Sequence, residues 1–386
     1  MLSERTDFLM DIRYFDGVNR NFGFGCMRLS LQDGRVDYDA FRKMIDLFMA
    51  EGFNYFDTAR IYLGGQSETA LRDCLVQRYP RESFILTDKL SNLFQSEEEV
   101  RPLFESQLAS CGVDYFDFYL MHSQNKSIFE KYRRCRAYEQ AFELKAEGKI
   151  RHVGISFHDT AEVLDEILTA YPQIEVVQIQ FNYADYNDSS VQGRQCYDVC
   201  RRHGKPILVM EPVKGGTLVN LPEEARRILD NLHGGSPASY AIRFAAGFEG
   251  IFMVLSGMSS LEQMQDNLSY MKEFQPLNAE EQEAIQKVCT IFRSMHTIPC
   301  TACRYCTDGC PKHISIPDLF AIMNAKQIHH DWNADCYYED VHTAPGRKAS
   351  DCLKCGKCEK VCPQHLPIRK LLEQVAAEFE KAPAAN

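Results

Sequence analysis

The chain has 386 residues, of which 45% are hydrophobic and 25% are charged, and this composition is typical of a soluble globular protein with two domains. A net charge of −11 argues against a nucleic-acid or anionic-membrane surface. The longest apolar runs, such as residues 118–121 and 251–255, are far too short to span a bilayer. Residues 1–14 hold no apolar signal segment, so we expect a cytoplasmic protein.

Short apolar runs rich in β-forming residues recur along the first three quarters of the chain. They cover residues 22–29, 53–57, 84–89, 116–122, 150–156, 176–182, 206–212 and 251–257. The segments between them have helical periodicity; Phe41, Ile45 and Phe48, for example, share one helix face. Eight strands that alternate with helices predict an α/β fold of the (β/α)8 TIM-barrel type. We expect this barrel over residues 1–295 and a second domain over residues 296–386.

Reactive side chains stand at or just after the ends of three predicted strands. Asp57 ends the second run and Tyr62 follows it, while Lys89 ends the third run and His122 ends the fourth. Catalytic groups of a parallel barrel gather at the carboxyl ends of its strands. A nearby Lys ammonium favours the Tyr phenolate and makes the phenol a better proton donor, and a His can hydrogen-bond a substrate oxygen. This set of residues predicts acid–base chemistry on a carbonyl group.

The segment GFNYFDTARIY at residues 52–62, with the later Lys and His, resembles the aldo-keto reductase superfamily. The resemblance extends over essentially the whole barrel. It implies that Tyr62 donates a proton, that Lys89 and Asp57 tune its acidity, and that His122 orients the carbonyl. It also implies a small-molecule carbonyl or alcohol substrate and a nicotinamide nucleotide as cofactor.

The same resemblance assigns the residues that contact the nucleotide. Ser156 and Gln178 occupy positions that bind the carboxamide, and Met210 replaces an aromatic residue that stacks on the nicotinamide ring. Further positions implied are Gly215 and Gly216 near the pyrophosphate, and Gly257, Gln263, Asp266 and Asn267 near the adenosine end. The basic residues that usually hold a 2′-phosphate are missing from this last group, and bidentate Arg contacts are the strongest phosphate ligands. The sequence therefore does not predict a preference for NADPH over NADH.

One cysteine pattern, C-x2-C-x2-C-x3-C-P, occurs twice near the C-terminus. The predicted ligands are Cys300, Cys303, Cys306 and Cys310 in the first run, and Cys352, Cys355, Cys358 and Cys362 in the second. This spacing is typical of 4Fe-4S clusters, with the fourth cysteine of each run reaching the other cluster. A zinc site would leave cysteines unused in each run, and nothing indicates a compartment that favours disulfides. We predict two 4Fe-4S clusters bound by one internally repeated domain.

The segment between the two runs shapes this domain. It holds 41 residues and includes a predicted helix at residues 316–328, which favours a mainly helical, ferredoxin-like arrangement. We predict that Cys336 is a free thiol and that His313 and His365, which recur at equal offsets, lie at helix entries rather than bind metal. With this tail included, the chain resembles the subgroup of aldo-keto reductases that carry a C-terminal 4Fe-4S ferredoxin-type domain.

The two halves leave three functions open. Hydride transfer moves two electrons at once, whereas a cluster passes one. In the first interpretation, the barrel is a nicotinamide-dependent carbonyl reductase or alcohol dehydrogenase, and its clusters serve a redox protein partner or stabilise the fold. Alternatively, the clusters feed electrons to a substrate in the barrel without nicotinamide. The third interpretation is an electron-transfer or docking subunit with an idle barrel.

Overall fold

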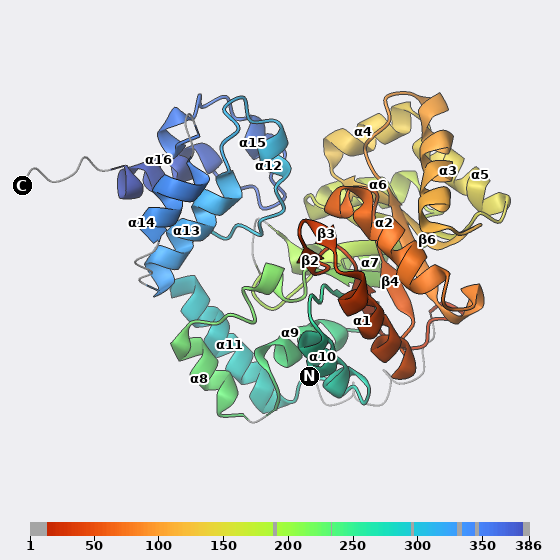
Figure 1. The fold of residues 1–386 in the computed structure, drawn as a ribbon, viewed down its shortest axis with the longest axis horizontal. Helices are drawn as coiled ribbons and strands as arrows, with labels where there is room; N and C mark the ends of the chain where they lie inside the picture. The colour runs from red at the N-terminus through yellow and green to blue at the C-terminus, as the bar shows by residue number, and fades with distance from the viewer. Residues whose placement is uncertain are drawn as a thin grey trace, which may run out of the picture.

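The computed structural model describes residues 14–187, 191–232, 234–294, 297–329, 334–343 and 347–380. Parallel strands close into a barrel in the order β1-β10-β9-β8-β7-β6-β5-β4 (Figure 1). Their bounds are β1 (Phe22–Gly25), β4 (Tyr55–Asp57), β5 (Ile85–Leu90), β6 (Phe116–Gln124), β7 (Ile150–Phe157), β8 (Val176–Gln180), β9 (Ile207–Met210) and β10 (Ile251–Ser256). Each strand falls within or overlaps one predicted run, which confirms the (β/α)8 barrel. A small hairpin, β2 (Leu31–Gln32) and β3 (Arg35–Val36), follows the first strand.

Helices pack around the strands because each presents an apolar stripe inward. They are α1 (Tyr38–Ala50), α2 (Gln66–Leu71), α3 (Val100–Cys111), α4 (Lys126–Arg134), α5 (Ala137–Ala146), α6 (Ala161–Ala170), α7 (Gly193–Arg202), α8 (Glu223–Asp230), α9 (Pro237–Ala246), α10 (Leu261–Met271) and α11 (Ala279–Ser294). In α1 the predicted face of Phe41, Ile45 and Phe48 is buried, and the side chain of Asp37 caps the helix by accepting from the Ala40 N–H. No helix in the described ranges is both long and apolar enough to cross a membrane.

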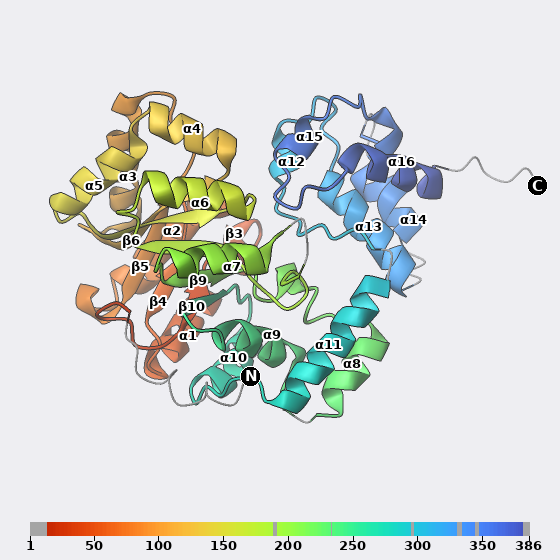
Figure 2. The same ribbon diagram turned by 180° about the vertical axis from the view of Figure 1, so that it is seen from behind.

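The second domain is mainly helical, as predicted. Its helices are α12 (Tyr305–Asp308), α13 (Ile316–His329), α14 (Ala334–Cys336), α15 (Lys357–Lys360) and α16 (Ile368–Phe379). They enclose an apolar core separate from that of the barrel. Figures 1 and 2 show this domain beside the barrel, with α11 leading towards it along the chain. The predicted boundary at residues 295 and 296 and the side chain of Cys336 lie outside the described part of the chain.

Backbone geometry repeats along with the cysteines. Ala302 and its counterpart Lys354 have φ of 55° and 54°, and His313 and His365 have φ of 51° and 48°. Left-handed backbone is uncommon for residues other than glycine, so its recurrence at equal offsets shows that both runs fold alike. The two histidines stand just before α13 and α16, at the helix entries that the repeat predicted.

Gly154 sits where the barrel interior is tightest. A Cβ atom there would lie 2.5 Å from Val176 Cγ1 and 2.6 Å from Leu120 Cδ2. We predict that Gly154→Ala lowers the free energy of unfolding by about 1–3 kcal/mol, the usual range for overpacking a core. Thermal denaturation followed by circular dichroism measures this. Gly25→Ala is the control, since its Cβ would find its nearest neighbours at 3.5–3.6 Å, and an equal loss in both variants would contradict the prediction.

Candidate active site

A buried ion pair lies at the carboxyl ends of two neighbouring strands. Asp57 ends β4 and Lys89 lies near the end of β5. The Lys89 Nζ is 2.5 Å from Asp57 Oδ1 and also donates to the Thr58 carbonyl at 2.8 Å. The Lys89 and Asp57 side chains are only 1% and 3% exposed. Burial raises the pKa of Asp57, and the Lys89 ammonium opposes that rise.

Tyr62 and His122 complete the predicted set around this pair. The Lys89 Nζ lies 4.9 Å from the centre of the Tyr62 ring. The Tyr62 and His122 rings meet edge to face, with 6.0 Å between their centres. On the far side of the imidazole, His122 Nδ1 is 3.1 Å from Ser91 Oγ. A hydroxyl that donates to Nδ1 leaves the proton on Nε2. The structure therefore brings all four predicted catalytic residues together.

Burial sets the protonation of both rings. It raises the pKa of the Tyr62 phenol well above its ordinary value, and the charge of Asp57 adds to the rise. The direction is opposite to the sequence prediction, in which Lys89 made the phenol more acidic, because burial disfavours a charged phenolate. Burial also lowers the pKa of His122 well below its ordinary value, and Lys89 adds to that shift. At neutral pH the phenol is protonated and the imidazole is neutral.

The predicted carboxamide residues lie on the adjoining wall of the barrel. Ser156 of β7 and Gln178 of β8 are paired in register, and both are buried. Ser156 Oγ accepts a hydrogen bond of 2.8 Å from the Ser123 N–H. Met210, at the end of β9, pairs with Gln180. Ser156, Gln178 and Met210 thus lie on three neighbouring strands, and their contact with a nucleotide stays a prediction.

Three of the predicted adenosine-end side chains are hydrogen-bonded to nearby serines. Gln263 Oε1 accepts from the Ser259 N–H at 2.8 Å, and Asn267 Nδ2 donates to Ser256 Oγ at 3.1 Å. Asp266 accepts from the Ser236 hydroxyl at 2.6 Å. The polar ends of these predicted side chains are thus already engaged within the barrel.

Arg28, which the sequence argument missed, supplies a cation beside this loop. A Cβ atom on Gly257 would lie 3.6 Å from the Arg28 side chain, and one on Gly215 would lie 3.7 Å from Arg28 Nη2. Its guanidinium is 3.9 Å from Glu211 Oε1. Gly215 and Gly216 have φ of 63° and 105°, so both turn positions favour glycine. Arg28 escaped notice because it follows the first strand rather than the phosphate loop.

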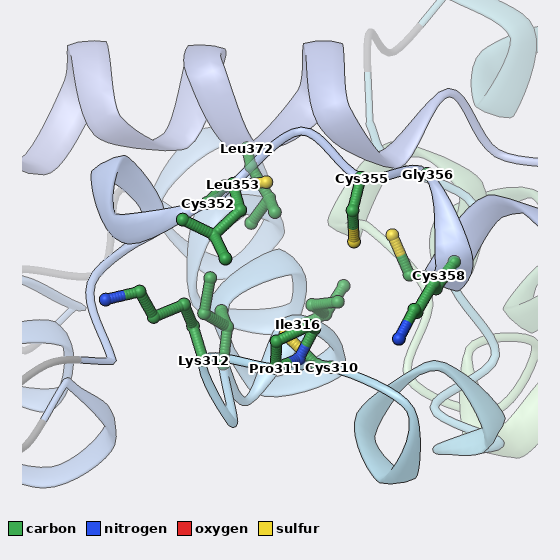
Figure 3. Close-up of a pocket in the computed structure, with 12 residues that line it drawn as sticks. Cys310, Pro311, Lys312, Ile316, Cys352, Leu353, Cys355, Gly356, Cys358 and Leu372 are labelled. Carbon is green, nitrogen blue, oxygen red and sulfur yellow. The ribbon is translucent and has the colours of Figure 1, made fainter.

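Four cysteines from both runs line one cavity in the second domain. Cys310 of the first run joins Cys352, Cys355 and Cys358 in lining this cavity (Figure 3). The fourth cysteine thus crosses to the other run, as the pattern predicted. The described residues include no group of three or more His, Cys, Asp or Glu side chains placed to hold a single metal ion. Four thiols around one cavity fit a multi-iron cluster better than zinc.

Cys362 makes the reciprocal crossing. Burial raises the pKa of the Cys306 thiol to about 12, with further contributions from the nearby Cys303, Cys300 and Cys362. These four therefore form the second thiol set. A cluster in this set would lie beside the barrel, because residues that flank its ligands contact the strand ends.

Two such flanking residues bridge the domains. Tyr305, between Cys303 and Cys306, has its hydroxyl 3.1 Å from Ser123 Oγ. Its ring meets that of His158 edge to face, with 6.2 Å between centres. Gln364 Nε2 donates to Gln180 Oε1 at 3.0 Å. The second thiol set thus faces the catalytic end of the barrel.

Sequence reasoning missed other residues of this site for different reasons. Ser91 stands two residues after Lys89, so strand alternation puts both on one face and could have revealed it. Burial lowers the pKa of His158 to about 4, and its Nδ1 has no hydrogen-bond partner among the described residues. In the sequence, Tyr305 is one of two residues between predicted cluster ligands, and nothing there indicates a role in the barrel. Its position in the site results only from the packing of the two domains.

A closed parallel barrel with Asp, Tyr, Lys and His at its strand ends is the architecture of an aldo-keto oxidoreductase. Residues 21–289 match the model of the aldo/keto reductase family, and residues 299–367 match that of the 4Fe-4S dicluster domain. The chain belongs to the aldo/keto reductase family, and it is an oxidoreductase whose barrel is followed by an iron–sulfur domain.

Known relatives share the barrel. The NADH-specific methylglyoxal reductase of Escherichia coli is 24% identical over 263 residues, covering 56% of this chain and 78% of the relative. L-galactose dehydrogenase of Arabidopsis thaliana is 25% identical, covering 72% of this chain and 91% of the relative. A solved aldo-keto reductase from Bacillus halodurans superposes with a TM-score of 0.57 at 26% identity, covering 70% of this chain and 92% of that one. An aldo-keto reductase from Klebsiella pneumoniae, solved with NADPH, shares the fold at 18% identity, with a TM-score of 0.57 over 69% of this chain and 90% of that one.

Because the fourth cysteine of each run lies with the first three cysteines of the other run, we can predict which substitutions lose the same cluster. We expect Cys306→Ser and Cys362→Ser to lose the same cluster, although they lie in different runs, because both side chains belong to one thiol set. Cys310→Ser should lose the other cluster. Iron analysis and electron paramagnetic resonance of the reduced proteins check this, with Cys289→Ser as a control outside both sets. Matching signal loss in Cys306→Ser and Cys310→Ser would contradict the crossing.

Proposed function

We propose that this protein reduces a small-molecule carbonyl, or oxidises the matching alcohol, with a nicotinamide nucleotide. Two 4Fe-4S clusters connect the barrel to a redox protein partner. The observation that carries the proposal is the convergence of Tyr62, His122 and the Asp57–Lys89 pair at one end of the barrel. The E. coli relative, named as an NADH-specific reductase of methylglyoxal, supports this chemistry.

The geometry divides the work among these residues. Nicotinamide, when bound, would supply a hydride to the carbonyl carbon. Tyr62 donates its proton to the carbonyl oxygen, and the Lys89 ammonium, 4.9 Å from the ring, stabilises the phenolate left behind. Asp57 holds the Lys89 amine in place through their hydrogen bond of 2.5 Å. His122, held by Ser91, donates from Nε2 and orients the oxygen before transfer. The alcohol so formed contains the added hydride and proton.

The residues present fit both cofactors. Ser156 and Gln178 give a polar wall for a carboxamide, and Arg28 gives a cation near the expected path of the pyrophosphate. Because no basic residue replaces the missing phosphate ligands within the loop after β10, we expect NADH to serve at least as well as NADPH. The two thiol sets provide four sulfur ligands for each cluster.

A second function is favoured by the position of the iron–sulfur domain. The Thr301 carbonyl would lie only 3.4 Å from a Cβ atom on Gly215, so this domain approaches the proposed nucleotide surface. Tyr305 reaches the same end of the barrel. In this alternative, clusters bound in the second domain would supply two electrons one at a time, Tyr62 would give one proton to the carbonyl oxygen, solvent would give a second proton to the carbon, and no nicotinamide takes part.

One anaerobic titration separates the two functions. The holoprotein is titrated with NADH, NADPH or dithionite while the cluster absorbance is recorded, and then a panel of small aldehydes and ketones is added. Nicotinamide-dependent turnover supports the first function. Turnover with dithionite alone, and none with either nucleotide, replaces it with the second. An absence of turnover with every reductant and carbonyl contradicts both.

Tyr62→Phe tests whether the barrel is catalytic at all. We expect carbonyl turnover to fall at least about 100-fold, because a general acid contributes typically 10²–10⁴ in rate. Iron content should stay unchanged, since Tyr62 lies outside both thiol sets. Steady-state kinetics and iron analysis check this, with Tyr115→Phe, at the opposite end of β6, as the matched control. Full carbonyl turnover in Tyr62→Phe would contradict the role of Tyr62 as proton donor.

A further inference from the structure

The two cysteine runs are related in sequence but differ in charge. Residues 297–386 contain 11 Lys plus Arg and 11 Asp plus Glu, so the net charge of −11 belongs entirely to residues 1–296. Within the second domain, residues 347–370 hold seven basic residues and two acidic ones. The first run faces the barrel through Tyr305, whereas the second run concentrates positive charge on an otherwise acidic molecule.

Part of this positive charge lies at the cavity of the second run, and the rest is carried by lysines next to its cysteines in sequence. We define the basic rim as Lys312, Lys354, Lys357 and Lys360, all of which are exposed. Lys312 and Lys357 line the cavity together with Leu353. Leu353 is 60% exposed and Val361 is 43% exposed, and both belong to the small set of exposed large apolar side chains among the described residues. Apolar side chains ringed by charge are typical of interaction surfaces.

Three of the four lysines of the basic rim form no ion pair with the described residues, so their charges are available to a binding partner. Lys354 pairs with Glu373 at 2.6 Å, but Lys312, Lys357 and Lys360 form no ion pair with any described residue. Figure 3 shows the Lys312 side chain extending away from the cysteines, so its charge points outward rather than onto the thiol set. Cys355, one of the four thiols, is itself exposed. A protein seated here would come close to the cluster.

We propose that the basic rim, with Leu353 and Val361, is the docking surface for a small acidic ferredoxin. This inference rests on the proposed function, whose redox partner it specifies. In each encounter one electron passes between the cluster of the carrier and the cluster at Cys310, Cys352, Cys355 and Cys358. No bond forms or breaks: the carrier is oxidised by one electron as the cluster is reduced, and the reverse holds when an electron leaves the protein.

Charge complementarity argues for an acidic carrier in particular. Opposite charges steer encounter and raise association rates by about 10- to 1,000-fold at low salt. The barrel, with its net charge of −11, repels an acidic protein, so productive encounters concentrate at the basic rim. A basic carrier would be drawn to the barrel instead, away from the exposed thiol set.

The test measures electron exchange between the oxidised holoprotein and a reduced acidic 2Fe-2S ferredoxin at several ionic strengths. Freeze-quench electron paramagnetic resonance separates the signals of the two proteins. In the double variant Lys312→Glu/Lys357→Glu, we expect the second-order rate constant to fall at least about tenfold at low salt. The difference should vanish at high salt, where charges are screened. The matched control Lys43→Glu/Lys287→Glu makes the same charge change on the barrel and should leave the rate constant unchanged.

A second variant separates docking from an effect on the cluster itself. Val361→Ser keeps every charge and lies outside the cavity lining, so we expect unchanged iron content and reduction potential but a several-fold rise in the Kd for the ferredoxin, measured by calorimetry. Equal rate constants for wild type and the rim variant at low salt would overturn the proposal. So would an equal effect in the barrel control. No carbonyl substrate is present, so failure of docking is independent of the Tyr62 test.

Discussion

The reciprocal crossing of the fourth cysteines constrains the whole C-terminal domain. Cys310 lies with three thiols of the second run, and Cys362 lies with three of the first. Neither run can complete its ligand set alone, so the two halves must fold around each other. The same crossing carries Gln364 to the barrel, where it bonds Gln180. Cluster ligation and the contact between domains therefore depend on one chain segment.

In the active site of the barrel, loss of contact with water is the largest influence on the pKa values of Tyr62 and His122. The Lys89 ammonium was expected to acidify Tyr62, yet burial and Asp57 together keep the phenol protonated. A phenol with a raised pKa is a weaker acid, but it stays protonated at neutral pH. It gives up its proton only as negative charge develops on a substrate oxygen. His122 is neutral for the same reason. In the proposed function, the Tyr62 phenol and the His122 imidazole act by donating hydrogen bonds to the substrate oxygen.

Much of the molecule could be predicted from local pattern. The alternation of strands and helices gave the barrel, and the spacing of cysteines gave the thiol sets and their crossing. Asp57, Tyr62, Lys89 and His122 came from position at strand ends. Arg28, Tyr305 and Gln364 could not be found in this way, because their roles arise from segments far apart in the chain that meet only when the two domains pack.

Through Tyr305 and Gln364, the second domain covers part of the catalytic end of the barrel. In most barrel enzymes the loops after the strands shape the substrate pocket and can vary without disturbing the rest. Here part of that boundary belongs to residues flanked by cluster ligands. In the proposed function, a change that enlarges the pocket on this side would also disturb electron delivery. Substrate range and redox input would then change together in evolution.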